Sequence, residues 1–155
     1  MAIRVRTRSH GIGRDLLKGA IAGAVATFVM GKVTGYMYEH EDRDARREED
    51  EARGGRASYG AAAGEAVSAT QWALGIGAGA AYAVLRRRFQ GLGTTAGTAF
   101  GTAFWAFLDE GLVPALGLTP GPTAFPWQTH ARGLVGHVTF GTVTDGTLRL
   151  LDRVA

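Results

Sequence analysis

The stretch LLKGAIAGAVATFVMGKVTGYMY, residues 16–38, decides the fold class. Its only formal charges are Lys18 and Lys32. At about 1.5 Å per residue, about 20 helical residues cross the roughly 30 Å hydrocarbon core of a bilayer. The stretch therefore predicts a transmembrane helix, and it is too long to be the apolar core of a cleaved signal peptide.

Three further stretches have the same character, and each is 22 residues or longer. Between the first two lies EHEDRDARREEDEARGGR, residues 39–56, which is too charged to enter a bilayer. The sequence therefore predicts an all-α membrane protein whose single domain, residues 1–155, holds four transmembrane helices and one charged loop outside the membrane. The expected spans are about 16–38, 59–85, 92–113 and 129–151.

The composition excludes several classes of protein. The chain holds 24 Gly residues and no Cys, so disulfide frameworks, thiolate metal sites and thiol nucleophiles are excluded. A net charge of +3, from 17 basic and 14 acidic residues, argues against nucleic-acid binding by bulk charge. So much Gly would weaken a soluble helical domain, but in lipid it allows close helix packing. The lipid bilayer is thus the first expected partner.

The distribution of Lys and Arg predicts the orientation of the spans. Ten lie on the side of the N-terminus, the turn at residues 86–88 and the C-terminus, whereas six lie on the opposite side. Cytoplasmic segments carry the excess of positive charge. Both termini are therefore expected in the cytoplasm, and the charged loop at residues 39–56 is expected on the extracytoplasmic side.

Glycines recur at four-residue spacing within the expected helices. Such pairs form grooves in which a neighbouring helix backbone can lie. The grooves either pack the four helices into one bundle or join this chain to copies of itself or to a larger membrane complex, and the sequence leaves both open. The expected helix-packing residues are Gly19, Gly23, Gly60, Gly64, Gly93, Gly97 and Gly101.

The two halves of the chain resemble each other. GAIAG at residues 19–23 matches GTAFG at residues 97–101, and each begins a pair of expected helices. This similarity indicates two repeated helical hairpins, although a composition rich in Gly and Ala would produce a similar match.

All four prolines lie in PALGLTPGPTAFP, residues 114–126, between the third and fourth expected helices. Pro cannot continue a helix, so the third helix is expected to end at about Pro114. The segment is then either a compact piece at the outer membrane interface or an ordinary tight connection.

The stretch LDEGLVPALGLTPGPTAFPWQTHARGLVGHVTFG, residues 108–141, resembles the YagU-like family of bacterial inner-membrane proteins of uncharacterised function. The resemblance depends on an acidic pair before a Pro, a GLTP turn, a later Pro-Trp and a Gly-His pair. It implies a helical fold and a bacterial inner-membrane location, and no established reaction. The charged loop departs from the family pattern, and Arg132 stands where an acidic residue is expected.

Ionisable residues gather in the outer half of the expected membrane region. A charge there costs several kcal/mol unless it faces the bundle interior and finds a partner. His130 and His137 are seven residues apart and so share one face of their helix. The expected polar cluster consists of Lys32, Glu65, Asp109, Glu110, His130 and His137.

Several functions fit such a cluster. Carboxylates and histidines in series predict a pathway for protons, small ions or another solute. A purely structural polar network fits equally well, and a metal site of Glu110, His130 and His137 fits less well because it lacks the tight spacing of helical zinc sites. An accessory subunit that packs through its glycine faces is a further alternative. No nucleophile motif, phosphate loop or cofactor fingerprint is present, so neither an enzyme nor a bound cofactor is expected.

Overall fold

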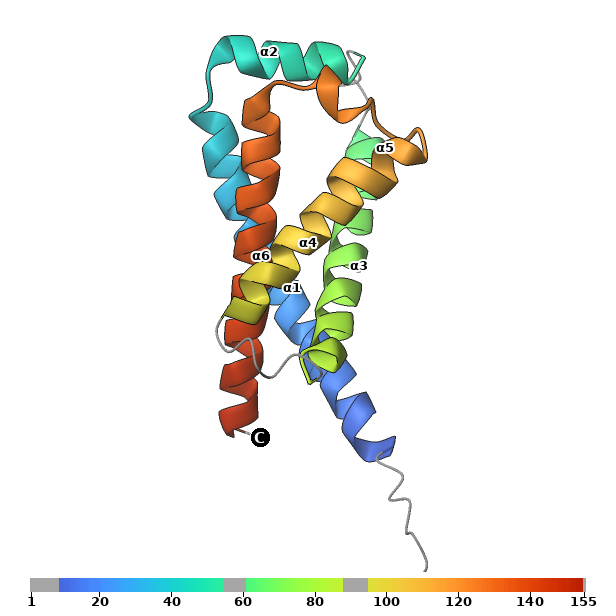
Figure 1. The fold of residues 1–155 in the computed structure, drawn as a ribbon, viewed down its shortest axis with the longest axis vertical. Coiled ribbons are helices and arrows are strands. Elements are labelled where there is room, and N and C mark those ends of the chain that lie inside the picture. The colour runs from blue at the N-terminus through green and yellow to red at the C-terminus, as the bar shows by residue number, and fades with distance from the viewer. Residues whose placement is uncertain (1–8, 55–60, 88–94, 155) are drawn as a thin grey trace, which may run out of the picture.

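The computed structural model describes residues 9–54, 61–87 and 95–154, with backbone alone for 9, 10 and 61–67. Every regular element in these ranges is a helix, as expected (Figure 1). The long segments coincide with the four expected helices, and a short helix lies between the first two. The elements are α1 (Ser9–Glu39), α2 (Arg43–Ala52), α3 (Ala61–Leu85), α4 (Ala96–Phe107), η3 (Leu108–Leu112), α5 (Val113–Ala115), η4 (Pro122–Ala124) and α6 (Trp127–Val154).

The long helices pack as a chain of neighbours. α1 packs against both α3 and α6, and α6 packs against α4. α3 and α4 are joined to the bundle mainly through these two central helices rather than through each other. The buried apolar core is correspondingly small, with Tyr82, Ala22 and Leu148 in its lower half and Phe100 packed against it. This arrangement leaves space between the upper parts of α3 and α4.

Glycine backbones form the contact between α1 and α3. A Cβ atom added at Gly19 would lie 2.5 Å from the carbonyl oxygen of Gly79, and one added at Gly79 would lie 2.5 Å from the Cα atom of Gly23. No side chain fits at these positions because the obstacle is backbone. Gly19 and Gly23, two of the expected packing residues, therefore lie at a contact within the chain.

The contact between α4 and α6 is built in the same way. A Cβ atom at Gly97 would lie 2.5 Å from the carbonyl oxygen of Gly141, and one at Gly101 would overlap the carbonyl oxygen of His137. The two helices of each hairpin therefore touch at glycine residues. The hairpins are α1 with α3 and α4 with α6. Of the other expected packing residues, Gly60 and Gly93 lie outside the described residues, and Gly64 lies where only the backbone is described.

The charged segment at residues 39–56 was expected from the sequence to be a loop outside the membrane, but part of it is a packed helix. Its middle forms α2, which lies across one end of the bundle (Figure 1). The helix begins where the Asp42 side chain accepts a hydrogen bond from the Asp44 amide at 3.0 Å, as an N-cap residue does. It ends before Gly54, whose φ of +74° suits a residue without a side chain. Because Ala45 and Glu49 are buried, α2 is part of the packed structure.

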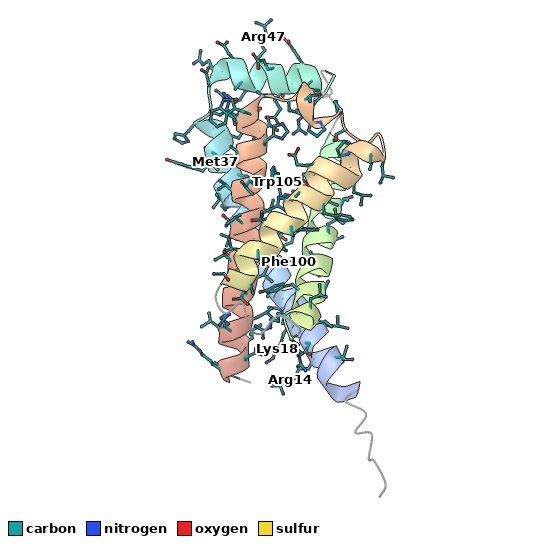
Figure 2. All side chains as sticks on the ribbon, viewed as in Figure 1. Arg14, Lys18, Met37, Arg47, Phe100 and Trp105 are labelled. Atoms are coloured by element: carbon teal, nitrogen blue, oxygen red, sulfur yellow. The ribbon has the colours of Figure 1, made fainter. Side chains whose placement is uncertain are left out.

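One helix in the described part of the chain, residues Gly11–Glu39, is long and apolar enough to cross a membrane. The fold therefore agrees with the expected all-α class, whereas the membrane crossing of the other three long helices is not established by length and composition. Charged side chains lie at both ends of the bundle, with Arg14 and Lys18 at one and Arg47 at the other (Figure 2). Phe100 and Trp105 lie between them.

Candidate functional site

A π-helical turn, η3, carries the adjacent acidic residues Asp109 and Glu110. It is closed by a hydrogen bond from the amide of Val113 to the carbonyl oxygen of Leu108. The wide turn directly precedes Pro114, which has no amide hydrogen to give to a helical carbonyl. With an ordinary helical turn, one carboxylate is expected to point inward. In the π turn, Asp109 and Glu110 both contact histidines of α6.

His130 holds Glu110 and the Pro-rich segment together. Its Nδ1 lies 2.6 Å from Glu110 Oε1, and its Nε2 lies 2.9 Å from the carbonyl oxygen of Pro122. Because a carbonyl oxygen only accepts, Nε2 carries a hydrogen and donates it to Pro122. The hydrogen between Nδ1 and Oε1 is then shared, either as imidazolium with carboxylate or as neutral histidine with carboxylic acid. This pair is chemically suited to take up and release one proton.

His137 and Asp109 form a second pair, about two helical turns further along the same face of α6. The Asp109 Oδ2 atom lies 3.6 Å from His137 Nδ1, and that nitrogen donates to the carbonyl oxygen of Gly133 at 3.0 Å. The imidazole of His137 is 6% exposed and its ring lies edge-on to Phe104, with centroids 5.3 Å apart. Since Nδ1 carries its hydrogen toward Gly133, Nε2 remains as the nitrogen that can gain or lose a proton.

Two cavities adjoin these pairs. The outer cavity has a volume of about 230 Å³, and its wall contains Glu110 and His130 beneath the Pro-rich segment. The inner cavity has a volume of about 670 Å³ and lies among α1, α3, α4 and α6, with His137 on its wall. Arg53, Asp109 and Val113 lie on the walls of both cavities, so Asp109 borders the two of them.

Arg132 ties the charged segment to the end of α6. Its guanidinium group forms ion pairs with Glu41 and Glu49, and all three side chains are nearly buried. Glu49 also accepts hydrogen bonds from Arg53 at 2.6 and 3.1 Å. Burial alone would raise the pKa of Glu49, but the hydrogen bonds from Arg132 and Arg53 outweigh it and hold that pKa below its ordinary value. The end of the bundle covered by α2 is thus closed by a network of charged side chains.

The opposite end of the bundle holds a separate network centred on Asp145. Its Oδ1 atom accepts a hydrogen bond from the Tyr82 hydroxyl at 2.9 Å, and its Oδ2 atom accepts one from Arg149 at 2.6 Å. Arg86 forms ion pairs with both Asp145 and Asp152. Asp152 forms a second ion pair with Lys18, at 2.8 Å. These contacts bring the start of α1 and the end of α6 to the same end of the bundle.

Aromatic rings separate the two polar regions. Tyr82, Phe100, Phe104 and Phe140 form a continuous series, with neighbouring centroids 4.7 to 6.0 Å apart. Phe140 is 1% exposed and lies at the base of the inner cavity. The rings therefore close the cavity on the side of Asp145.

The structure brings together four of the six residues expected in the polar cluster. Lys32 is exposed on α1, where its Nζ lies 5.6 Å from the centroid of the Phe28 ring, away from the two histidine pairs. The side chain of Glu65 lies outside the described residues. In the described part of the chain, no three His, Asp or Glu side chains are grouped as metal ligands, so Glu110, His130 and His137 do not form one site.

Sequence reasoning missed the partners of Arg132 and the role of Asp145. Arg132 was noticeable as a departure from the family pattern, and Glu41 and Glu49 lie in the segment that also departs from it. Because that segment was expected to be a loop outside the membrane, there was no reason in the sequence to predict a contact between it and Arg132. Asp145 lies within the fourth expected span and was given no role, although its position four residues before Arg149 is typical of a helical ion pair.

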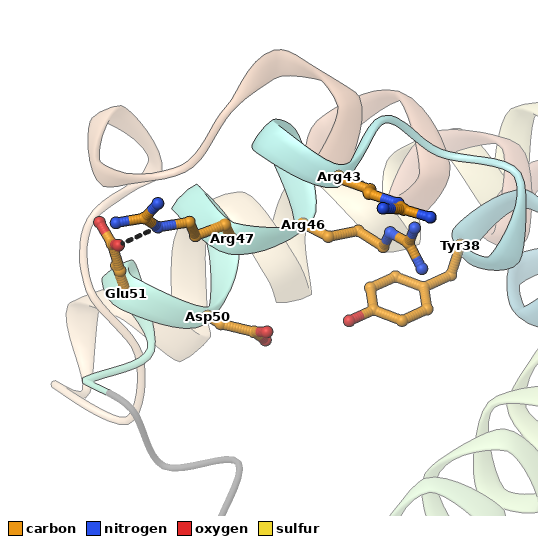
Figure 3. A pocket seen from close by; sticks show the side chains of 6 residues that line it. All are labelled: Tyr38, Arg43, Arg46, Arg47, Asp50 and Glu51. Carbon is orange, nitrogen blue, oxygen red and sulfur yellow. Dashed lines mark hydrogen bonds and ion pairs between the residues drawn. The ribbon is translucent and has the colours of Figure 1, made fainter.

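An open surface hollow of about 630 Å³ lies along α2 and is lined by charges of both signs (Figure 3). Arg47 pairs with Glu51 at 2.9 Å across one end of it. At the other end the guanidinium group of Arg46 lies 5.7 Å from the centroid of the Tyr38 ring. With Asp50 also on the wall, this hollow has no dominant charge.

A family model described as "Protein of unknown function (DUF1440)" matches residues 57–146, which is more than half of the chain. The chain belongs to this family. The matched residues of this DUF1440 protein include both histidine pairs and Arg132, whereas α2 with its Glu49 lies before them. The family's description gives neither a membrane location nor a YagU-like relationship, so both remain predictions from the sequence. Searches of curated proteins and of solved structures found no match.

Proposed function

We propose that this DUF1440 protein is a four-span protein of the bacterial inner membrane with both termini in the cytoplasm. Its polar cluster provides a pathway for protons or another small ion or solute. One observation carries the proposal: two histidine and carboxylate pairs on η3 and α6 line two cavities that share Asp109 on their walls. Carboxylates and histidines inside a membrane are costly and mark pathways for protons and ions.

The exposed surface of α1 supports insertion in lipid. Leu17, Ile21, Val25 and Phe28 are each between 43% and 64% exposed and recur along one side of the helix. Only 28% of the most apolar window of this helix is buried. A core helix of a soluble protein would bury most of such a window. A contiguous exposed apolar surface of this kind is typical of contact with lipid or another protein.

The other long helices contribute to the same apolar surface. Trp72 and Leu74 on α3, Phe107 on α4 and Val135 on α6 are all between 38% and 65% exposed. The glycine contacts between helices support the same proposal, because transmembrane helices rely on close backbone packing where the hydrophobic effect is absent. α4 has only 12 residues, and its length is compatible with a span only when η3 and α5, which continue it to Ala115, are counted with it.

The proposed route begins at the outer cavity. A proton shared by His130 and Glu110 would pass across the cavity to Asp109 and His137, about 10 Å further along α6 at 1.5 Å per residue. The aromatic series then separates His137 from Asp145. Transport through this route requires the rings to move, so the described conformation corresponds to a pathway that is closed on the side of Asp145.

An accessory subunit of a larger membrane complex is the second candidate function. It is favoured by Gly31 and Gly35 on α1, where an added Cβ atom would meet nothing within 4 Å. Unlike the other glycine pairs of α1, this pair makes no contact with the described part of the chain. It offers a face on which a helix of a partner could pack.

Proton transport is tested with the purified protein in liposomes. We expect protein-containing liposomes to dissipate an imposed pH gradient faster than empty ones. His137→Ala and Glu110→Gln should each slow the dissipation at least tenfold, because each removes a group that can hold a proton. Glu48→Gln, an exposed change on α2, serves as the control.

Two results would contradict proton transport. Liposomes with the unmodified protein that are as tight as empty ones would exclude it. Variants that conduct protons at the normal rate but melt at lower temperatures would assign the cluster a structural role, since a buried partner left unpaired is destabilising. Purification of the native protein with a stoichiometric second membrane protein would favour the accessory subunit.

A further inference from the structure

The inner cavity has the size and the wall of a small-molecule site. Its volume of about 670 Å³ lies within the usual range for ligand pockets, roughly 300 to 1,000 Å³. Most of its wall is apolar, contributed by Met30, Leu74, Phe104, Leu108 and Phe140. Such a wall favours the body of an apolar ligand over a hydrated ion.

Asp109 is the acidic residue among those that line this wall. Its side chain is 39% exposed, and no hydrogen bond from the described part of the chain reaches it. The nearest basic group is His137 Nδ1 at 3.6 Å, whose hydrogen is directed to Gly133. By contrast, the neighbouring Glu110 is bonded to His130 at 2.6 Å. The carboxylate oxygens of Asp109 can therefore accept further hydrogen bonds beside an apolar cavity. A positive charge placed next to them is strongly favoured.

The rings beside Asp109 suit a cationic ligand as well. Phe104 and Phe140 both line the cavity, and their centroids lie 6.0 Å apart. An organic cation placed against such faces gains a cation–π interaction in addition to the contact with the carboxylate. The hydroxyl of Thr27 donates to the carbonyl oxygen of Gly23 at 2.8 Å, so a metal ion would find few oxygen ligands here.

Arg53 is the cation on the wall of the cavity, and its position limits its effect. Its guanidinium group is bonded to Glu49 at 2.6 Å and lies 5.7 Å from the centroid of the Phe125 ring. Its side chain is 52% exposed. The charge of Arg53 is therefore balanced by Glu49 at the outer mouth, while the charge of Asp109 faces the cavity.

Two of the apolar residues that line the cavity are also exposed at the surface of the protein. Leu74 is 48% exposed, and Leu118 is 66% exposed. In the proposed membrane setting these residues face the apolar part of the bilayer. A lipophilic ligand would reach the cavity directly from the membrane, without passing the charged network of Arg132 at the outer end.

We propose that the inner cavity binds a lipophilic organic monocation whose apolar groups contact Phe104 and Phe140 and whose charge is balanced by Asp109. The inference rests on the proposed membrane pathway, because it assigns the ligand class to the same cavity. It does not require proton transport, which depends on the histidines. Binding needs only the carboxylate, the rings and access from the membrane.

Equilibrium dialysis of the full chain in detergent micelles tests the inference, with tetraphenylphosphonium as the probe and protein-free micelles as the blank. Tetraphenylborate is the matched control, because it has the same shape and the opposite charge. We expect saturable binding of tetraphenylphosphonium and at least tenfold weaker binding of tetraphenylborate. Asp109→Asn should weaken tetraphenylphosphonium binding at least tenfold, whereas Glu48→Gln, which removes one exposed charge, should change it less than twofold.

Asp109→Glu keeps the charge and should retain binding within a few-fold, so the test survives if Asp109→Asn fails to fold. Equal binding of both probes, or unchanged binding in Asp109→Asn, would show an unselective apolar groove and overturn the inference. Absence of saturable binding would overturn it as well. Saturable cation binding by a protein whose liposomes hold a pH gradient would contradict proton transport alone, and the reverse result would contradict cation binding alone.

Discussion

Arg132→Ala is expected to release α2 from the end of the bundle. The substitution leaves Glu41 and Glu49, whose side chains are 8% and 5% exposed, without their shared partner. Glu49 keeps its hydrogen bonds from Arg53 and Thr129, so the loss falls mainly on Glu41. A buried charge left uncompensated by removal of its partner costs about 3 to 5 kcal/mol. At about 1.4 kcal/mol for each tenfold change, amide hydrogen exchange in α2 should be at least about a hundredfold faster.

Arg47→Ala is the matched control for this prediction, since it also removes an arginine that pairs with a glutamate of the charged segment. Its partner Glu51 is 2.9 Å away, and the two side chains are 79% and 65% exposed. Exposed pairs contribute about 0 to 1 kcal/mol, so exchange in α2 should change less than about fivefold. Similar exchange rates in the two variants would mean that the buried network does not hold α2 in place.

Gly141→Ala is expected to disturb the packing of α4 on α6. The new Cβ atom would overlap the carbonyl oxygen of Gly97 and lie 2.8 Å from the amide nitrogen of Gly101. Neither obstacle is a side chain that can rotate away. Overpacking of this kind costs about 1 to 3 kcal/mol. The Tm of the detergent-solubilised protein should fall by at least about 3 °C.

Gly146→Ala tests the same substitution on the same helix where nothing lies within 4 Å of an added Cβ atom. Its Tm should stay the same or rise, because Ala is a better helix former than Gly by about 1 kcal/mol. The changes in Tm of the two variants are therefore expected to differ in sign as well as in size. A Gly141→Ala protein as stable as the Gly146→Ala protein would show that α4 and α6 do not meet at these backbones.

Hydropathy was sufficient to predict the four long helices. Residues 16–38 and 129–151 lie within α1 and α6, because an apolar, charge-poor segment has its backbone bonded internally whatever surrounds it. The contacts of Gly19 and Gly101 could be predicted from the spacing of the glycines, since a small residue at every fourth position marks one face of a helix. These features are local, and local patterns are visible in sequence.

The features that sequence did not predict depend on contacts between distant segments. The π turn at Asp109 and Glu110 changes the direction of both carboxylates, so counting residues at an ordinary helical angle gave one inward group instead of two. Lys32 was assigned to the cluster from its depth in the helix, but depth does not determine which side of α1 it occupies. Arg132 found its partners in a segment expected to be solvated.

The central claim is that the chain crosses the bilayer so that α2 and the turn after α3 lie on opposite sides. The chain has no cysteine, so single Cys residues placed at Glu48 and at Arg87 report the two sides without background. We expect Cys at position 48 to react with a membrane-impermeant maleimide on intact cells, and Cys at position 87 to react only after the cells are opened. Labelling of position 87 on intact cells, or of neither position until the cells are opened, would contradict the account.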